Sequence, residues 1–158
     1  MAMRSDAVSD PAALDFWLGD WSCTWEGGHG SNRVAKELGG RVVVERFECL
    51  APERWSGISM SVLDRRLGRW RQTWVDSTGN YWALEEGRDR GDLAFEVDEI
   101  ETGDDGSRVE VRKRMVFSDI DENAFRWRWE RSLDGGAEWE PLWTIDYTRG
   151  EGAGTADA

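Results

Sequence analysis

The sequence has few of the residues that metal and redox chemistry use. Its 158 residues include one histidine, His29, and two cysteines, Cys23 and Cys49. A single histidine excludes a His–His metal site, a two-histidine iron site and the HExxH motif of zinc peptidases. Two cysteines are too few for a zinc ribbon or a disulfide framework. We therefore expect no metal and no cofactor, and we interpret both cysteines as buried packing thiols.

Long apolar runs and an excess of positive charge are also missing. No apolar stretch approaches the roughly 18 residues of a membrane-spanning helix, and residues 1–6 lack the apolar segment of a secretion signal. The formal net charge is −12, from 32 acidic and 20 basic residues, so we expect no positive surface for a phosphate backbone. These absences argue against nucleic-acid and membrane partners and favour a cytoplasmic protein.

Tryptophan, in contrast, is abundant, with eleven in the chain. Its side chain is large and flat and carries one hydrogen-bond donor. So many indoles in a chain of this length indicate either a wide interior or a surface that binds a flat molecule.

Apolar and polar residues alternate with a period of two along nearly the whole chain, which is typical of β-strands with one buried face. The predicted strands are residues 21–25, 34–38, 41–50, 55–64, 69–76, 81–86, 93–99, 108–118, 125–132 and 139–149. Short strands with a turn about every 8–12 residues and no long crossover indicate an all-β fold. We predict an antiparallel up-and-down β-barrel of about ten strands, because closure removes the sheet edges.

The chain length predicts one domain. Residues 1–10 are expected to form a flexible leader, residues 11–149 the barrel, and the Gly- and Ala-rich residues 150–158 a disordered tail. A capping residue and a proline at residues 9–11 predict a short helical turn over residues 12–17. We expect a monomer or a homodimer.

A ten-stranded barrel is wide enough to hold a small ligand. Indoles that point inward would line an apolar cavity suited to a flat or hydrophobic molecule, whereas simple core packing is the alternative role for most of them. Which face points inward depends on strand parity, and a slip of one residue reverses it. The candidate ligand-binding residues are Trp25, Trp70, Gln72, Trp74, Tyr81, Trp127, Trp129 and Trp143.

Asp76 and His29 are the candidate catalytic residues. Asp76 shares a strand face with Trp74, so inward burial would raise its pKa, as a general acid requires; alternatively it caps the turn that follows. His29 lies in a glycine-rich stretch, residues 27–31, that either folds over the barrel mouth or is an exposed loop without a role. Tyr81 and Glu130 are further acid–base candidates.

Charged residues alternate with the aromatic ones on the later strands. We expect cross-strand ion pairs on a solvated outer face. The residues concerned are Arg126, Arg128 and Glu130 on one strand and Glu110, Arg112 and Arg114 on its neighbour.

Residues 15–21, in which Gly19 and Trp21 form a Gly-x-Trp arrangement, resemble the N-terminal motif of lipocalins and other calycins. Residues 68–76 and 129–139 are similar to a bacterial lipocalin-like family described mainly as a domain of unknown function. The resemblance covers roughly residues 12–149 and implies a ten-stranded barrel that binds a small molecule. It also implies that Trp21 packs at the closed end under Arg149.

The nitrobindin-like barrels, a related branch, bind haem through a histidine late in the chain. This sequence has no histidine after His29, so the resemblance does not carry haem binding over. Trp127 stands where the family would have a glutamine, which implies a more aromatic and less polar cavity.

Three functions remain open from the sequence. The first is binding of a hydrophobic or aromatic small molecule in the barrel. The alternative is a cofactor-free isomerase, cyclase or hydratase acting on a natural-product-like substrate, and a protein-interaction domain is a third option. We favour binding because no acid–base pair with a fixed spacing is visible in the sequence.

Overall fold

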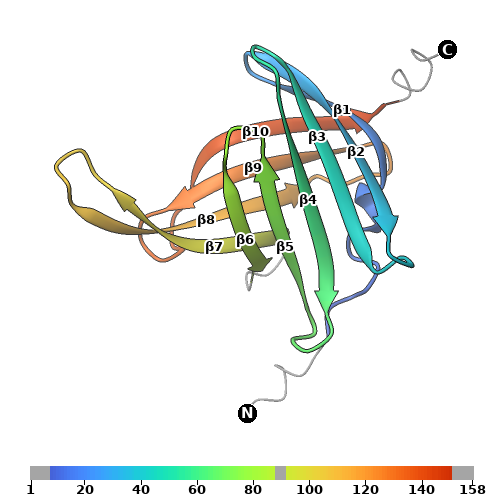
Figure 1. The fold of residues 1–158 in the computed structure, drawn as a ribbon, viewed down its shortest axis with the longest axis horizontal. Helices are drawn as coiled ribbons and strands as arrows, with labels where there is room; N and C mark the ends of the chain where they lie inside the picture. The colour runs from blue at the N-terminus through green and yellow to red at the C-terminus, as the bar shows by residue number, and fades with distance from the viewer. Residues whose placement is uncertain (1–7, 88–91, 151–158) are drawn as a thin grey trace.

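The computed structural model describes residues 8–87 and 92–150, which form a closed antiparallel β-barrel (Figure 1). The strands are β1 (Gly19–Trp25), β2 (Gly28–Glu37), β3 (Val42–Ala51), β4 (Trp55–Asp64), β5 (Arg69–Asp76), β6 (Tyr81–Glu86), β7 (Leu93–Thr102), β8 (Arg108–Ser118), β9 (Ala124–Ser132) and β10 (Glu140–Arg149). Each strand pairs with the next along the chain, and β10 closes the barrel against β1. The predicted fold class and strand number are confirmed.

The alternation seen in the sequence decides which side chains fill the barrel. In β1, Trp21 and Cys23 are buried while Ser22 and Thr24 are exposed. Successive side chains of a strand point to opposite faces of the sheet, so the period of two separates an interior from a solvated exterior. Both cysteines are buried and free, as expected.

The predicted loop over residues 27–31 is wrong. Residues 28–31 belong to β2, and of this stretch only Gly27 lies in the turn before it. A Cβ atom on Gly30 would overlap the carbonyl oxygen of Glu48 on β3. Glycine therefore allows two strands to approach closely here. The pairing shifts register between His29 and Gly30, as at a β-bulge.

Two further elements differ from the sequence prediction by three residues, and the bounds of β1, β3, β9 and β10 differ by one or two. The expected helical turn is limited to a 3₁₀ turn over Asp15–Trp17. Strand β7 runs on to Thr102 and pairs with β8 along its whole length, so the β7–β8 hairpin extends beyond the rest of the barrel (Figure 1). No helix among the described residues has the length and apolar character needed to cross a membrane.

The 3₁₀ turn closes one end of the barrel with aromatic packing. Trp17 is fully buried, and the ring of Phe16 meets the edges of Phe117 and Phe125 with centroids 5.4 Å apart in each case. Such edge-to-face contacts add to the burial of large apolar surfaces. This end of the barrel is therefore a packed core.

The Gly-x-Trp arrangement is explained by one arginine. The guanidinium carbon of Arg149 lies 4.0 Å from the centre of a ring of Trp21, and the same side chain donates a hydrogen bond to the carbonyl of Leu18. Gly19 has a φ of +124°, and a Cβ atom there would overlap the guanidinium. The contact between Trp21 and Arg149 is thus the one that the resemblance implied.

Residues 8–10, the last part of the expected leader, are held against the barrel. The Ser9 amide donates to the carbonyl of Gly68 at 2.8 Å, and its hydroxyl donates to Glu86 at 2.6 Å. Gly150 is also bonded, through its amide, to the Asp20 carbonyl. The remainder of the expected leader and tail, residues 1–7 and 151–158, lies outside the described residues.

Candidate functional site

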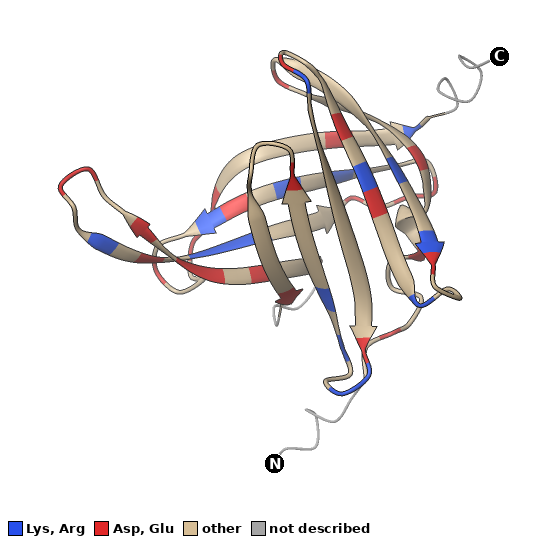
Figure 2. Cartoon of the chain, viewed as in Figure 1, with Lys and Arg blue, Asp and Glu red and all other residues tan. Residues whose placement is uncertain are grey.

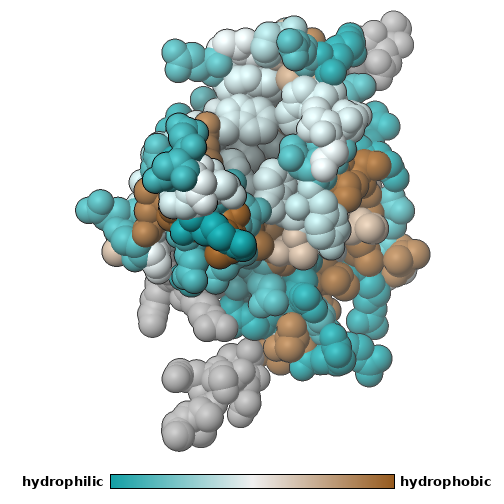
Figure 3. Space-filling model, turned by 60° about the vertical axis from the view of Figure 1, so that its left-hand side comes forward, coloured by the Kyte–Doolittle hydropathy of each residue, from teal (hydrophilic) through white to brown (hydrophobic). Residues whose placement is uncertain are grey.

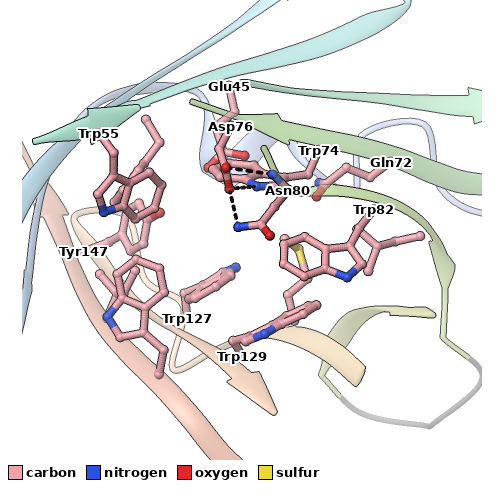
Figure 4. A pocket seen from close by; sticks show the side chains of 15 residues that line it. Glu45, Trp55, Gln72, Trp74, Asp76, Asn80, Trp82, Trp127, Trp129 and Tyr147 are labelled. Atoms are coloured by element: carbon pink, nitrogen blue, oxygen red, sulfur yellow. Dashed lines mark hydrogen bonds between the residues drawn. The ribbon is translucent and has the colours of Figure 1, made fainter. Parts of the chain in front are cut away.

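A cavity of about 230 Å³ lies inside the barrel beyond the packed end (Figure 4). Phe47 and Tyr147 contribute to its wall together with six of the eleven tryptophans. The six are Trp55, Trp74, Trp82, Trp127, Trp129 and Trp143. Figure 3 shows pale side chains, of intermediate hydropathy, gathered round a recess in one face of the molecule. The cavity is smaller than the roughly 300–1,000 Å³ of sites for drug-sized ligands, so a matching ligand is small.

The wall around Trp74 depends on two neighbours. Its Nε1 donates to Asp76 Oδ2 at 2.8 Å, and its ring lies over Gly57 on β4, where a Cβ atom would overlap the indole. An indole held by one hydrogen bond and by one close backbone contact has a fixed orientation. Gly57 and Asp76 therefore position this part of the wall.

Asp76 is a turn cap with a saturated carboxylate. It accepts hydrogen bonds from the backbone and side chain of both Thr78 and Asn80, at 2.7–3.2 Å, in addition to Trp74. Partial burial acts to raise its pKa, but the bonds from Thr78, Trp74 and Asn80 outweigh burial and place the pKa below its usual value. The direction is opposite to the one expected for a general acid, because donors stabilise the ionised form.

Glu45, on β3, is the other carboxylate of the cavity, and it is 5 % exposed. It accepts from the Ser59 hydroxyl at 2.6 Å and from the Asn32 amide at 2.7 Å; the same amide donates to the Tyr147 hydroxyl at 3.0 Å. Burial raises the pKa of Glu45, and the bonds from Ser59 and Asn32 only partly oppose that effect. Burial also raises the pKa of Tyr147. The two cavity carboxylates thus have opposite shifts.

Gln72 adds a neutral polar group to the wall. It is 2 % exposed, and its Nε2 donates to the Ser61 hydroxyl at 2.9 Å. Its Oε1 has no hydrogen-bond partner among the described residues. A buried carbonyl without a donor is unfavourable, so Gln72 presents an acceptor that a ligand can satisfy.

Charged groups lie beside the aromatic wall where β6 faces the β7–β9 strands. Trp82 packs against Trp129 with ring centroids 5.2 Å apart, and its Nε1 donates to Glu99. Lys113 pairs with Glu99 at 3.2 Å and lies 6.0 Å from the centre of the Trp82 ring. These contacts fix Trp82 although β6 and β7 are paired at only two positions among the described residues.

Six of the ten candidate site residues come together in the cavity wall. They are Gln72, Trp74, Asp76, Trp127, Trp129 and Trp143. The other four lie elsewhere. His29 is exposed on β2, and Tyr81 is 63 % exposed because the neighbouring Trp82 takes the inward position on β6. This is the one-residue parity choice that alternation alone leaves open.

Trp25 and Trp70 have packing positions next to the cavity. Trp70 is buried, and its Nε1 donates to the Asp10 carbonyl at 3.0 Å, so it belongs to the core. Trp25 meets Trp143 at 5.1 Å between ring centroids and supports the wall from behind. Trp25 and Trp70 therefore have the role in core packing that the sequence left open as the alternative to ligand binding.

Sequence reasoning missed several residues of the wall, and Glu45 is the most informative of them. Glu45 is in phase with the buried Val43 and Phe47 on β3. A charged residue at an apolar position of an alternating strand is the signal that could have found it. Asn32 on β2 and Tyr147 on β10 are in phase with buried neighbours in the same way.

Of the ion pairs expected between β8 and β9, the one between Arg114 and Glu130 forms, and its centre is not solvated. Arg112 pairs with Asp98 on β7, and Arg126 pairs with Asp146 on β10. Glu130 is 6 % exposed and accepts from Arg114 at 2.8 Å and from Arg128 at 3.0 Å. Arg114 in turn lies 3.8 Å from the centre of a ring of Trp139. Figure 2 shows acidic and basic positions side by side on β7, β8 and β9. Glu130 lies outside the cavity lining and is therefore part of an outer-face network.

No group of three or more His, Cys, Asp and Glu side chains among the described residues is arranged to hold a metal ion. No family model matches the chain, and no curated protein matches it either. The cavity is therefore the feature of the described residues that bears on function.

Proposed function

We propose that the barrel binds a small hydrophobic or aromatic molecule in this cavity. One observation supports the proposal above all: eight aromatic side chains surround a space that no side chain fills. A ligand that buries about 200 Å² of apolar surface gains roughly 5 kcal/mol before ordering costs, which corresponds to weak binding with a Kd of about 0.2 mM at best. The wall is held by hydrogen bonds and close contacts, so little of that free energy is needed for ordering.

Tryptophan emission tests this proposal because the indoles form the wall. 4-Phenylbutan-1-ol, a neutral probe that does not emit in the tryptophan range, should change the emission in a saturable way. Trp127→Phe, in the wall, should reduce the amplitude, whereas Trp139→Phe, stacked on Arg114 outside the cavity, should not. Absence of a saturable signal in emission and in titration calorimetry would overturn the proposal.

A second function, cofactor-free catalysis, has one observation in its favour. Glu45 has a raised pKa at the wall of a largely apolar cavity, which is the usual condition of a general acid. The enzyme would then be an isomerase, cyclase or hydratase. Loss of turnover in Glu45→Gln with ligand binding intact would favour catalysis. A protein that only binds its ligand would show no turnover to lose.

The lipocalin-like family stays a proposal as well. The packing of Trp21 under Arg149 supports it, together with the ten-stranded closed barrel. Cytoplasmic location and a monomeric or homodimeric state stay predictions from the sequence.

A further inference from the structure

The cavity wall carries negative charge and no positive charge. Of its fifteen residues, all among the described ones, two are carboxylic acids and none is Lys, Arg or His. The aromatic rings add to this bias, since the face of an aromatic ring attracts cations. The net charge of −12 over the whole chain acts in the same direction.

Two polar residues of the wall, Glu45 and Gln72, belong to one row that crosses three strands. Glu45 on β3 lies opposite Ser59 on β4, and Gln72 on β5 lies opposite Ser61, two residues further along the same face of β4. Each serine bonds to its partner across the strand pair. The row therefore places a carboxyl group and an unpartnered carbonyl oxygen on the same side of the cavity.

Within this row Glu45 has the capacity to bind a donor. Its partners among the described residues are the neutral side chains of Ser59 and Asn32, one on each oxygen, and each oxygen can accept a further bond. The carboxylate of Asp76 accepts five bonds already. Burying an ionised carboxyl group is costly unless a cation or a proton compensates the charge, and no cation from the described residues does so at Glu45.

We propose that the ligand is an organic cation: a small aromatic or hydrophobic body that bears an ammonium group, bound by Glu45 and Gln72 and enclosed by the indoles. The ammonium would supply the positive charge that Glu45 lacks and a donor for Gln72 Oε1. The hydrophobic body would fill the aromatic part of the cavity. This inference rests on the proposed binding function and adds the charge of the ligand to it.

Three probes of equal length test the charge directly: 4-phenylbutylamine, 4-phenylbutan-1-ol and 4-phenylbutanoate, titrated by calorimetry near neutral pH. The amine should bind about tenfold or more tightly than the alcohol, as expected for a desolvated cation–π and ion-pair contact. The carboxylate should bind most weakly. Equal affinity of amine and alcohol would overturn the inference and leave the proposed function standing, whereas no binding of any probe would overturn both.

Two variants test whether Glu45 and Gln72 cause the preference for the amine. Glu45→Gln should weaken the amine about tenfold and leave the alcohol nearly unchanged, because only the charged contact is lost. Glu48→Gln, exposed on the other face of the same strand, is the matched control and should bind all probes like the wild type. Gln72→Met, which keeps the volume, gives an independent check should Glu45→Gln fold poorly. An amine preference that survives in both cavity variants would contradict the assignment.

Discussion

At the scale of single residues, two carboxylates in one cavity behave in opposite ways. Asp76 is surrounded by donors from its own turn, and these lower its pKa. Glu45 is buried more deeply with two neutral donors, and burial raises its pKa. The difference comes from the local chain. Thr78 and Asn80 in the turn after β5 donate four hydrogen bonds to Asp76, and Trp74 on β5 donates a fifth, whereas the donors to Glu45 are on other strands. Burial and neighbouring donors, and not residue type, decide the direction in which each carboxyl pKa is shifted.

The free energy of unfolding should depend on pH in a way that is set by Glu45. The raised pKa means that the folded state holds the Glu45 proton to a higher pH than the unfolded state, so the free energy of unfolding falls as the pH rises above about 4.5, the ordinary value. Glu45→Gln removes this loss. Urea unfolding near pH 4 and pH 8 should therefore show the variant gaining stability relative to the wild type at the higher pH.

Glu48→Gln is the control for this pH measurement, because it removes a carboxyl from the exposed face of the same strand. A Glu45→Gln variant whose stability relative to the wild type is the same at both pH values would show that burial does not shift the Glu45 pKa.

At the scale of the strands, alternation in the sequence was sufficient to place most elements. Strands β4, β5, β6 and β8 begin and end where the sequence predicts. The sequence left the inward face of β6 open, because Tyr81 and Trp82 are both aromatic and alternation does not say which one enters the barrel. Tyr81, the candidate on this strand, is exposed. The glycines of β2 predict a loop from the sequence alone, because the close approach of β3 that requires them involves residues distant in sequence.

Gly57→Ala tests how strand packing shapes the wall. The added methyl group would overlap the Trp74 indole, so the ring must move and its bond to Asp76 should break. We expect a destabilisation of about 1–3 kcal/mol, typical of overpacking, and a weaker binding of 4-phenylbutan-1-ol. Thermal unfolding and calorimetry measure both effects.

Ser56→Ala, at the exposed neighbouring position, should change neither property. Binding and stability at wild-type values in Gly57→Ala would contradict the contact between Gly57 and Trp74.

At the scale of the whole molecule, the barrel divides into a packed end and a hollow part. Arg149, Trp21 and the 3₁₀ turn hold the packed end, while the indoles of β4 to β6, β9 and β10 surround the cavity. The sequence predicted both the closed barrel and an aromatic interior. It could not predict which indoles pack and which line the space, because Trp70 and Trp74 share a strand face and differ only in the elements that cover them.

Arg149→Lys should affect the packed end and leave ligand binding in the hollow part unchanged. Lysine cannot reproduce the planar guanidinium that covers Trp21 and bonds to the carbonyls of Phe16, Leu18 and Glu122. We expect a loss of roughly 2–4 kcal/mol in the free energy of unfolding, from several charged hydrogen bonds. The affinity for 4-phenylbutan-1-ol should stay unchanged under folded conditions. A large loss of affinity with little loss of stability would show that the two ends are coupled.

The most direct measurement of the central claim is a crystal structure of the protein soaked with 4-phenylbutan-1-ol. The phenyl ring should occupy the space between Trp74, Trp127 and Trp143, with the barrel unchanged around it. A structure in which the indoles close the cavity and leave no space for the probe would contradict the claim that this barrel is built around a ligand.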